Sequence, residues 1–272
     1  MRMGLLAAGV FPVLVSCIPL PGMPSFSGNL RKRDVVYVPQ DWAKQLKGDL
    51  YRPALPGKLP GVLLIHGDGR VSEDGRWQMA GIAEKLADRG YVVFNITYRM
   101  APDWEYPAPL LDAKQALNWM RDHADEYGMD GERIGAYGYS AGGYVALLTA
   151  FREDTRIGAV VGGASPVDLT YYGNGNLIRD FLGGSPGEVP ERYREASPVD
   201  HVTANSPPVF LYHGEKDTLV NPDHTLEMLV ELKKHRVPHE VHWIPAKGHI
   251  AAFLMPGGAV DGAIGFLDRH LK

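Results

Sequence analysis

The sequence has 272 residues, enough for one domain with a sizeable core, and its 45% hydrophobic and 22% charged residues are ordinary for a globular protein. The 28 basic and 32 acidic residues are scattered along the chain and give a formal net charge of −4. Because no basic stripe is present, we expect no nucleic-acid partner. The single cysteine, Cys17, excludes an internal disulfide.

The first residues of the chain have the pattern of an export signal. The letters MRM are followed by an apolar stretch over residues 4–15, which is too short to span a bilayer as a helix. Residues 14–17, LVSC, resemble the lipobox of bacterial lipoproteins, in which the cysteine is lipidated and becomes the first mature residue. We therefore predict a lipoprotein signal peptide over residues 1–16. Lipidated Cys17 would then anchor an exported bacterial lipoprotein to a membrane, in the periplasm or at the cell surface. The alternatives are an ordinary cleaved signal and a frayed apolar terminus.

Residues 17–33 are rich in Pro, Gly and Ser without periodicity, which predicts a flexible tether. Over residues 34–272, strand and helix patterns alternate, which indicates one domain. Apolar runs bounded by turn residues are typical of strands buried on both faces of a sheet. Strands are predicted at residues 61–66, 91–96, 133–138, 158–162, 208–213 and 241–244, with a hairpin of edge strands at 35–38 and 48–51.

Helices are predicted where apolar residues recur at spacings of three and four. They cover residues 79–87, 110–127, 141–151 and 260–271, with a further helix that opens at residues 221–222 and a short one at 177–182. Strands that alternate with helices predict an α/β fold, in which a mostly parallel central sheet has helices on both faces. Ligands on such sheets bind at the carboxyl ends of the strands.

Residues 168–200 are rich in Gly, Tyr and Pro and are predicted to be mostly loop. They form either a small cover over a binding pocket, with Tyr171 and Tyr172 as lining, or a surface excursion between strands. The segment is too short for a large lid.

The letters GYSAG at residues 138–142 fit the pattern G-x-S-x-G and lie between a predicted strand and a predicted helix. A serine on a sharp strand-to-helix turn has a strained backbone, and only small residues two positions before and after it avoid a collision. Gly138 and Gly142 meet that need. We therefore predict that Ser140 is a nucleophile. A glycine-rich helix start without a catalytic role is the alternative.

A serine hydroxyl is a poor nucleophile unless a base takes its proton. His249 follows the last predicted strand, and Asp217 follows the strand that ends at His213. Both therefore lie at carboxyl ends of strands, on the same edge as Ser140. A carboxylate bound to one imidazole nitrogen fixes the tautomer, so that the other nitrogen can accept the serine proton. We predict a triad of Ser140, His249 and Asp217.

Other titratable residues fit these roles less well. Glu215 is the alternative acid, whereas Asp200 and Asp223 are worse placed. His242 lies within a strand and His270 at the end of the last helix, so both are poor candidates for the base.

Backbone N–H groups are also needed to meet the charge that develops on a substrate oxygen. One is expected from Ala141, directly after the predicted nucleophile. The others are expected from the loop HGDGR at residues 66–70.

Together these motifs resemble the esterase/lipase branch of the α/β-hydrolases, near the hormone-sensitive-lipase-like group and closer to compact enzymes related to bacterial feruloyl and acetyl-xylan esterases. The order serine, acid, histidine is that of the α/β-hydrolase fold. HGDG at residues 66–69 matches the HGGG oxyanion motif with one change, and YRMAP at 98–102 resembles the Y-R-x-A-P segment. FLGG at 181–184 and ASPV at 196–199 resemble the segment before the acid-bearing strand. The resemblance covers roughly residues 35–272.

The resemblance implies that the amides of Asp68 and Gly69 join that of Ala141 in an oxyanion hole. Because a carboxylate would oppose an oxyanion, we expect the Asp68 side chain to point away from the hole, towards Arg70. Tyr139, where relatives often carry His or Asp, is expected to pack against the turn.

The resemblance also implies hydrolysis of carboxylic esters through a serine acyl-enzyme, without a metal or cofactor. Short acyl groups are the expected substrates, such as acetyl or feruloyl groups on plant polysaccharide. A serine peptidase of the prolyl-oligopeptidase type shares the fold and the triad order and is one alternative. A surface-anchored binding protein that kept the fold and lost the chemistry is another. Dehalogenases and epoxide hydrolases are disfavoured because they carry Asp where this chain has Ser140.

Overall fold

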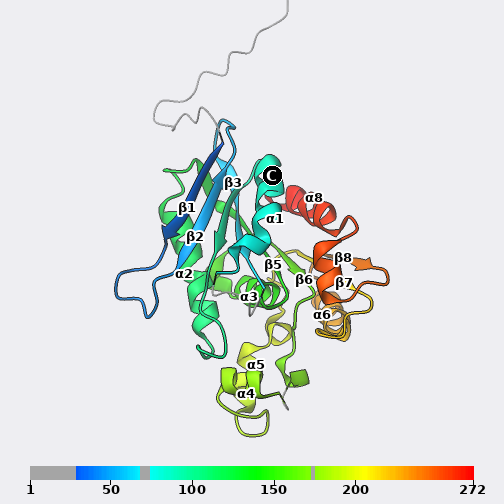
Figure 1. Cartoon of the computed structure of the whole chain (residues 1–272). Coiled ribbons are helices and arrows are strands. Elements are labelled where there is room, and N and C mark those ends of the chain that lie inside the picture. The colour runs from blue at the N-terminus through cyan, green and yellow to red at the C-terminus, as the bar shows by residue number, and fades with distance from the viewer. Residues whose placement is uncertain (1–28, 68–73, 173–174) are drawn as a thin grey trace, which may run out of the picture.

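The computed structural model describes residues 29–67, 74–172 and 175–272 (Figure 1). The strands are β1 (Leu30–Val36), β2 (Lys47–Arg52), β3 (Leu59–Ile65), β4 (Val92–Ile96), β5 (Met129–Tyr139), β6 (Ala159–Gly163), β7 (Val209–Gly214) and β8 (His239–Ile244). Within the described residues they form one eight-stranded sheet in the order β1-β2-β4-β3-β5-β6-β7-β8. β2 is antiparallel to both β1 and β4, and the remaining neighbours are parallel.

The helices that follow the strands are α1 (Arg76–Asp88), α2 (Ala108–Asp122), α3 (Ala141–Ala150), α4 (Asn176–Leu182), α5 (Pro190–Ala196), α6 (Asp223–Lys234), α7 (His249–Leu254) and α8 (Ala259–Leu271). Three short 3-10 turns, η1 (Glu153–Thr155), η2 (Leu169–Tyr172) and η3 (Pro198–His201), complete the described elements. None of the helices in these residues combines the length and the apolar character needed to cross a membrane.

Helices cover both faces of the sheet, because successive residues of a strand point to opposite faces. In β3, Leu63 and Ile65 belong to one buried core, whereas Val62 and Leu64 belong to the other. The first core lies between the sheet and helices α2, α3 and α6, and the second lies between the sheet and helices α1 and α8 (Figure 1). The predicted mostly parallel sheet with helices on both faces is therefore confirmed.

The element boundaries differ most from the predicted ones at the start of β1 and at the end of α2. β1 begins at Leu30, so residues 30–33, predicted as the end of the tether, belong to the sheet. Their basic side chains are tolerated there because β1 is an edge strand and they lie largely in solvent. α2 ends at Asp122 rather than at residue 127. The ring Nδ1 of His123 lies 2.8 Å from the Trp119 carbonyl oxygen, and the chain continues in turns.

The segment over residues 168–172 and 175–200, called the cover below, contains α4 as predicted and also α5, which was not predicted. In Figure 1, α4 and α5 lie together beyond one end of the sheet. α7 was not predicted either, and it begins at His249, one of the predicted site residues.

Candidate active site

Ser140 lies at a sharp turn between β5 and α3. Its backbone, with φ 56° and ψ −126°, is in a region that L-residues rarely adopt. The Ser140 N–H donates a hydrogen bond to the Gly163 carbonyl oxygen on β6, at 2.7 Å. A Cβ on Gly138 would lie 2.1 Å from the Gly142 carbonyl oxygen, and one on Gly142 would lie 2.2 Å from that of Ile65. The strained turn can close against the sheet only because both positions are glycine.

The structure brings the three predicted triad side chains together. The Ser140 hydroxyl lies 2.9 Å from His249 Nε2, and His249 Nδ1 lies 2.6 Å from Asp217 Oδ2. The Asp217 and His249 residues are buried, at 5% and 8% exposure. With Nδ1–H donating to the carboxylate, Nε2 is left free to accept the hydroxyl proton. Glu215, the alternative acid, is exposed.

The loops that carry the acid and the histidine are joined by their backbones. The Lys216 N–H donates to the Lys247 carbonyl oxygen at 2.9 Å, and the Glu215 N–H donates to that of Ile244 at 3.1 Å. Because β7 and β8 are parallel neighbours, both loops leave the sheet at the same edge. The distance between Asp217 and the imidazole is therefore set by the sheet itself.

The Asp217 carboxylate is buried but well supplied with donors. Its Oδ1 accepts hydrogen bonds from the N–H groups of Leu219 and Val220, each at 2.9 Å. Its Oδ2 is contacted by His249 Nδ1 and, at 3.3 Å, by His213 Nε2. Burial alone would raise the pKa of Asp217, but the hydrogen bonds from His213, His249 and the backbone hold that pKa below its usual range. Asp217 is therefore ionised at neutral pH.

The second residue of the turn, Tyr139, does more than pack against it. Its hydroxyl donates a hydrogen bond to the His249 carbonyl oxygen at 2.7 Å, where α7 begins. Its ring lies 5.2 Å from the His249 ring and 4.9 Å from that of Phe253. The residue before the serine thus fixes the backbone of the histidine, a contact that the sequence analysis missed.

Ala141 is the first residue of α3, so its N–H has no acceptor within the helix and is available to a ligand. Asp68, Gly69 and Arg70 lie outside the described residues, and their predicted roles stay predictions. Gly67 lies beside the nucleophile, since a Cβ at Gly67 would be 3.3 Å from that of Ser140.

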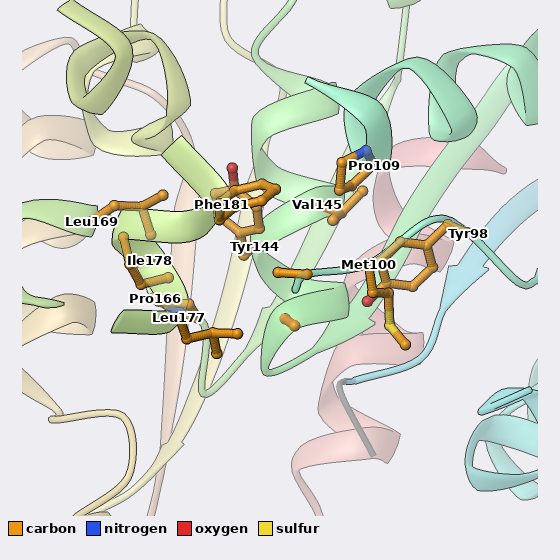
Figure 2. A pocket seen from close by; sticks show the side chains of 12 residues that line it. Tyr98, Met100, Pro109, Tyr144, Val145, Pro166, Leu169, Leu177, Ile178 and Phe181 are labelled. Atoms are coloured by element: carbon orange, nitrogen blue, oxygen red, sulfur yellow. The ribbon is translucent and has the colours of Figure 1, made fainter. Parts of the chain in front are cut away.

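Ala141, the residue after Ser140, also lines an apolar cavity of about 100 Å³. Figure 2 shows side chains of the cover on one side and those of α3 and the loop after β4 on the other. The lining residues are Tyr98, Met100, Ala101, Pro109, Ala141, Tyr144, Val145, Pro166, Leu169, Leu177, Ile178 and Phe181. Most of them could not be predicted from the sequence, because neighbours across the cavity are far apart along the chain.

The loop after β4, which supplies Tyr98, Met100 and Ala101 to the cavity, is anchored by a buried ion pair. Arg99 donates to the Asp112 carboxylate through its backbone N–H at 2.8 Å, through Nε and through Nη2 at 2.7 Å. Asp112 is fully buried and Arg99 is 7% exposed. In this chain, the arginine of the predicted Y-R-x-A-P motif therefore anchors the loop that borders the cavity.

The cover is attached to the rest of the domain mainly through side chains. Arg152 Nη2 donates to the Glu195 carbonyl oxygen at 2.8 Å. The Val167 N–H donates to Nδ1 of buried His224 at 3.4 Å, so His224 Nε2–H donates to the Tyr172 hydroxyl oxygen at 3.0 Å. Burial lowers the pKa of His224 to about 4 and keeps the ring neutral. Tyr172, expected as pocket lining, instead stacks on His224.

Within the described part of the chain, no group of three or more His, Cys, Asp or Glu side chains is arranged to hold a metal ion. The arrangement of hydroxyl, imidazole and carboxylate suits nucleophilic attack by Ser140 on an acyl group that enters the cavity beside Ala141.

The sheet, the serine turn and the order of the three side chains define an α/β-hydrolase. The chain belongs to the BD-FAE family, whose model matches residues 49–232. The matched range includes Ser140 and Asp217 and ends before His249.

Some curated relatives are named as esterases, and one is named as a peptidase. Esterase LipC of Mycobacterium tuberculosis is 29% identical over 224 residues, which cover 75% of this chain and 54% of that protein. The chain thus spans about half the length of this relative. A protein named uncharacterized peptidase YtmA, of Bacillus subtilis, is 30% identical over 241 residues, which cover 82% of this chain and 91% of that protein.

A similar solved structure is that of a thermophilic esterase, Est2, from Thermogutta terrifontis with propionate bound. It is 25% identical in sequence with a TM-score of 0.74, over 90% of this chain and 96% of that one.

Proposed function

We propose that this protein is a serine esterase that hydrolyses carboxylic esters with short acyl groups. The observation that carries the proposal is the hydrogen-bonded series Ser140, His249 and Asp217 beside an apolar cavity. Membership of the BD-FAE family and similarity to proteins named as esterases support it.

In the proposed reaction, Ser140 Oγ attacks the ester carbonyl carbon while its proton moves to His249 Nε2. The developing oxyanion accepts a hydrogen bond from the Ala141 N–H and, as we propose from the sequence, from the amides of Asp68 and Gly69. His249 then returns the proton to the leaving alcohol, and an acyl group remains on Ser140. Water, deprotonated by His249, attacks the acyl carbon; the bond to Ser140 Oγ breaks, the carboxylic acid leaves, and His249 returns the proton to Ser140 Oγ. Ionised Asp217 stabilises the imidazolium in both steps.

The size of the cavity favours short acyl groups. Its volume of about 100 Å³ is below the roughly 150 Å³ of a protein cavity that holds benzene. An acetyl or propionyl group fits this space more readily than a feruloyl group, whose ring would have to extend out of the cavity. We therefore propose acetyl esters, including those of plant polysaccharide, ahead of feruloyl esters.

The decisive test compares the wild type with Ser140→Ala on p-nitrophenyl esters of increasing length and on acetylated and feruloylated xylan. We expect Ser140→Ala to lose at least about 10³-fold in kcat, because triad serines contribute this much or more. Turnover by Ser140→Ala close to that of the wild type would refute the mechanism. Faster release of ferulate than of acetate would refute the proposed acyl preference.

A serine peptidase is the second candidate, and the match to nearly the whole length of YtmA favours it. The same triad could cleave an amide, because His249 can protonate an amine as well as an alcohol. Turnover of peptidyl anilides without turnover of esters would favour this candidate. A binding protein without chemistry would fail to react with a fluorophosphonate probe, which labels only an activated serine.

We also propose, from the sequence alone, that the protein is an exported lipoprotein anchored through Cys17, which lies outside the described residues. Cys17→Ala should move the protein from the membrane fraction to the soluble fraction. Mass spectrometry of membrane-extracted protein that shows an unmodified Cys17 would contradict this proposal.

A further inference from the structure

A second histidine, His213, contacts the carboxylate of the triad. It lies near the end of β7 and its side chain is fully buried. Its Nε2 lies 3.3 Å from Asp217 Oδ2 and 2.9 Å from the Val220 carbonyl oxygen, and its Nδ1 lies 2.7 Å from the Thr225 hydroxyl on α6. No step of the proposed reaction uses this ring.

The partners of His213 fix its tautomer. A carbonyl oxygen only accepts, so the contact with Val220 requires a hydrogen on Nε2. In the neutral ring, Nδ1 then accepts the hydrogen bond from the Thr225 hydroxyl. The Nε2–H donates to the Val220 carbonyl oxygen at 2.9 Å, and Asp217 Oδ2 is a second, longer contact of the same nitrogen, at 3.3 Å. Each polar atom of the buried ring is thereby satisfied.

We propose that His213 is a positioning residue that holds the Asp217 carboxylate in the orientation needed by His249. Two backbone N–H groups hold Asp217 Oδ1, and the orientation of the carboxylate further depends on what holds its second oxygen. His213 supplies a donor to Oδ2, the oxygen that also receives His249 Nδ1. The inference rests on the proposed function and adds a residue that does not touch the substrate.

The same ring also connects both ends of the loop that carries the acid. His213 belongs to the strand before the loop, Val220 ends the loop, and Thr225 belongs to the helix after it. The ring further stacks on Trp243 of β8, with centroids 6.3 Å apart. An apolar side chain could fill the space of the ring. Without a hydrogen-bond donor and acceptor, it could not join Val220 to Thr225.

The test is His213→Leu, compared with His213→Gln, which keeps an N–H donor. We expect His213→Leu to lower kcat for p-nitrophenyl acetate roughly tenfold to hundredfold with little change in KM, because a hydrogen bond to a charged group is lost away from the substrate. His213→Gln should recover most of the activity. Should His213→Leu fail to fold, as judged by thermal unfolding, His213→Met replaces it.

A double-mutant cycle with Asp217→Asn separates positioning from general damage. If His213 acts through the carboxylate, His213→Leu costs much less in the Asp217→Asn background than in the wild type. An equal loss of kcat in both backgrounds, or a loss that appears mainly in KM, would overturn the inference.

The rate at which a fluorophosphonate labels Ser140 separates a failure of this inference from a failure of the proposed function. A wild type that does not react with the probe contradicts the proposed function. A wild type that reacts, with a His213→Leu variant that reacts equally fast, contradicts only the role of His213.

Discussion

The edge of the sheet that carries the triad and the cover that lines one side of the cavity are held by different kinds of contact. At the triad edge, the turn at Ser140 and the loops of the acid and the histidine are fastened by backbone hydrogen bonds between neighbouring strands. The cover consists of two seven-residue helices and short turns, and it is fastened to the rest of the domain mainly by side chains such as Arg152 and His224.

This difference assigns separate tasks to the two regions. Backbone hydrogen bonds survive most substitutions, so the distances between nucleophile, base and acid persist while surrounding residues change. Contacts through side chains change with single substitutions, so the shape of the acyl cavity can vary on the same framework. Substitutions at the triad edge should therefore affect kcat, and those in the cover should affect the choice of substrate.

The largest effect is expected from Asp217→Asn. An amide at this position no longer fixes the tautomer in which His249 Nε2 accepts a proton, and the comparable change in a serine protease lowers kcat about 10⁴-fold. Steady-state kinetics on p-nitrophenyl acetate measures the loss. Glu215→Gln is the matched control, since Glu215 is exposed and close in the chain, and it should stay near the wild-type rate. A larger loss in Glu215→Gln than in Asp217→Asn would make Glu215 the acid.

A smaller but still large effect is expected from Asp112→Leu, at the base of the loop that borders the cavity. The change leaves the Arg99 guanidinium buried without its partner, which costs about 3–5 kcal/mol of unfolding free energy. Urea unfolding followed by circular dichroism measures it. Glu132→Gln, which breaks the exposed pair with Arg156, should cost about 0–1 kcal/mol. Similar losses in both variants would contradict the role of burial.

The fold and the grouping of the triad side chains could be anticipated from the sequence because their signals are local. Apolar runs marked the central strands, and Ser140, Asp217 and His249 each follow a strand directly, so the common direction of the strands gathers them at one edge. The steric need for Gly138 and Gly142 could be inferred from the pattern alone, and the close contacts of both positions agree with it.

The remaining features depend on contacts between distant segments. The cavity combines Tyr98, Ala141 and Phe181, which come together through tertiary packing. Their spacing in the sequence does not indicate it. α5 buries only Tyr193 and Ala196, and α7 has only six residues, so neither shows a clear helical period. The contacts of Tyr139 and His213 were missed for the same reason, because a buried hydroxyl or imidazole gives no sign in the sequence of the atom that it contacts.

Leu177→Ala tests whether the cover determines the choice of substrate. Leu177 lines the cavity from α4 and is only half-buried, so its truncation lengthens the cavity at little cost in stability. We expect the ratio of kcat/KM for hexanoate to that for acetate to rise by up to about tenfold. The control Leu226→Ala removes a half-exposed leucine of α6 outside the cavity lining and should leave the ratio unchanged. An unchanged ratio in Leu177→Ala would show that the acyl group binds elsewhere.

The smallest effect is expected from Tyr139→Phe, which removes only the hydroxyl that holds the His249 backbone. Tyr137→Phe is a close control, because Tyr137 lies on the same strand and its buried hydroxyl bonds to that of Tyr212 rather than to the histidine. Each variant loses one buried hydrogen bond and should lose about 1 kcal/mol of unfolding free energy. Only Tyr139→Phe should also lower kcat, by a few-fold, because the start of α7 then moves relative to Ser140. Equal kcat values in the two variants would mean that the sheet edge alone positions the imidazole. The Tyr139 hydroxyl would then contribute to stability but not to the position of the His249 ring.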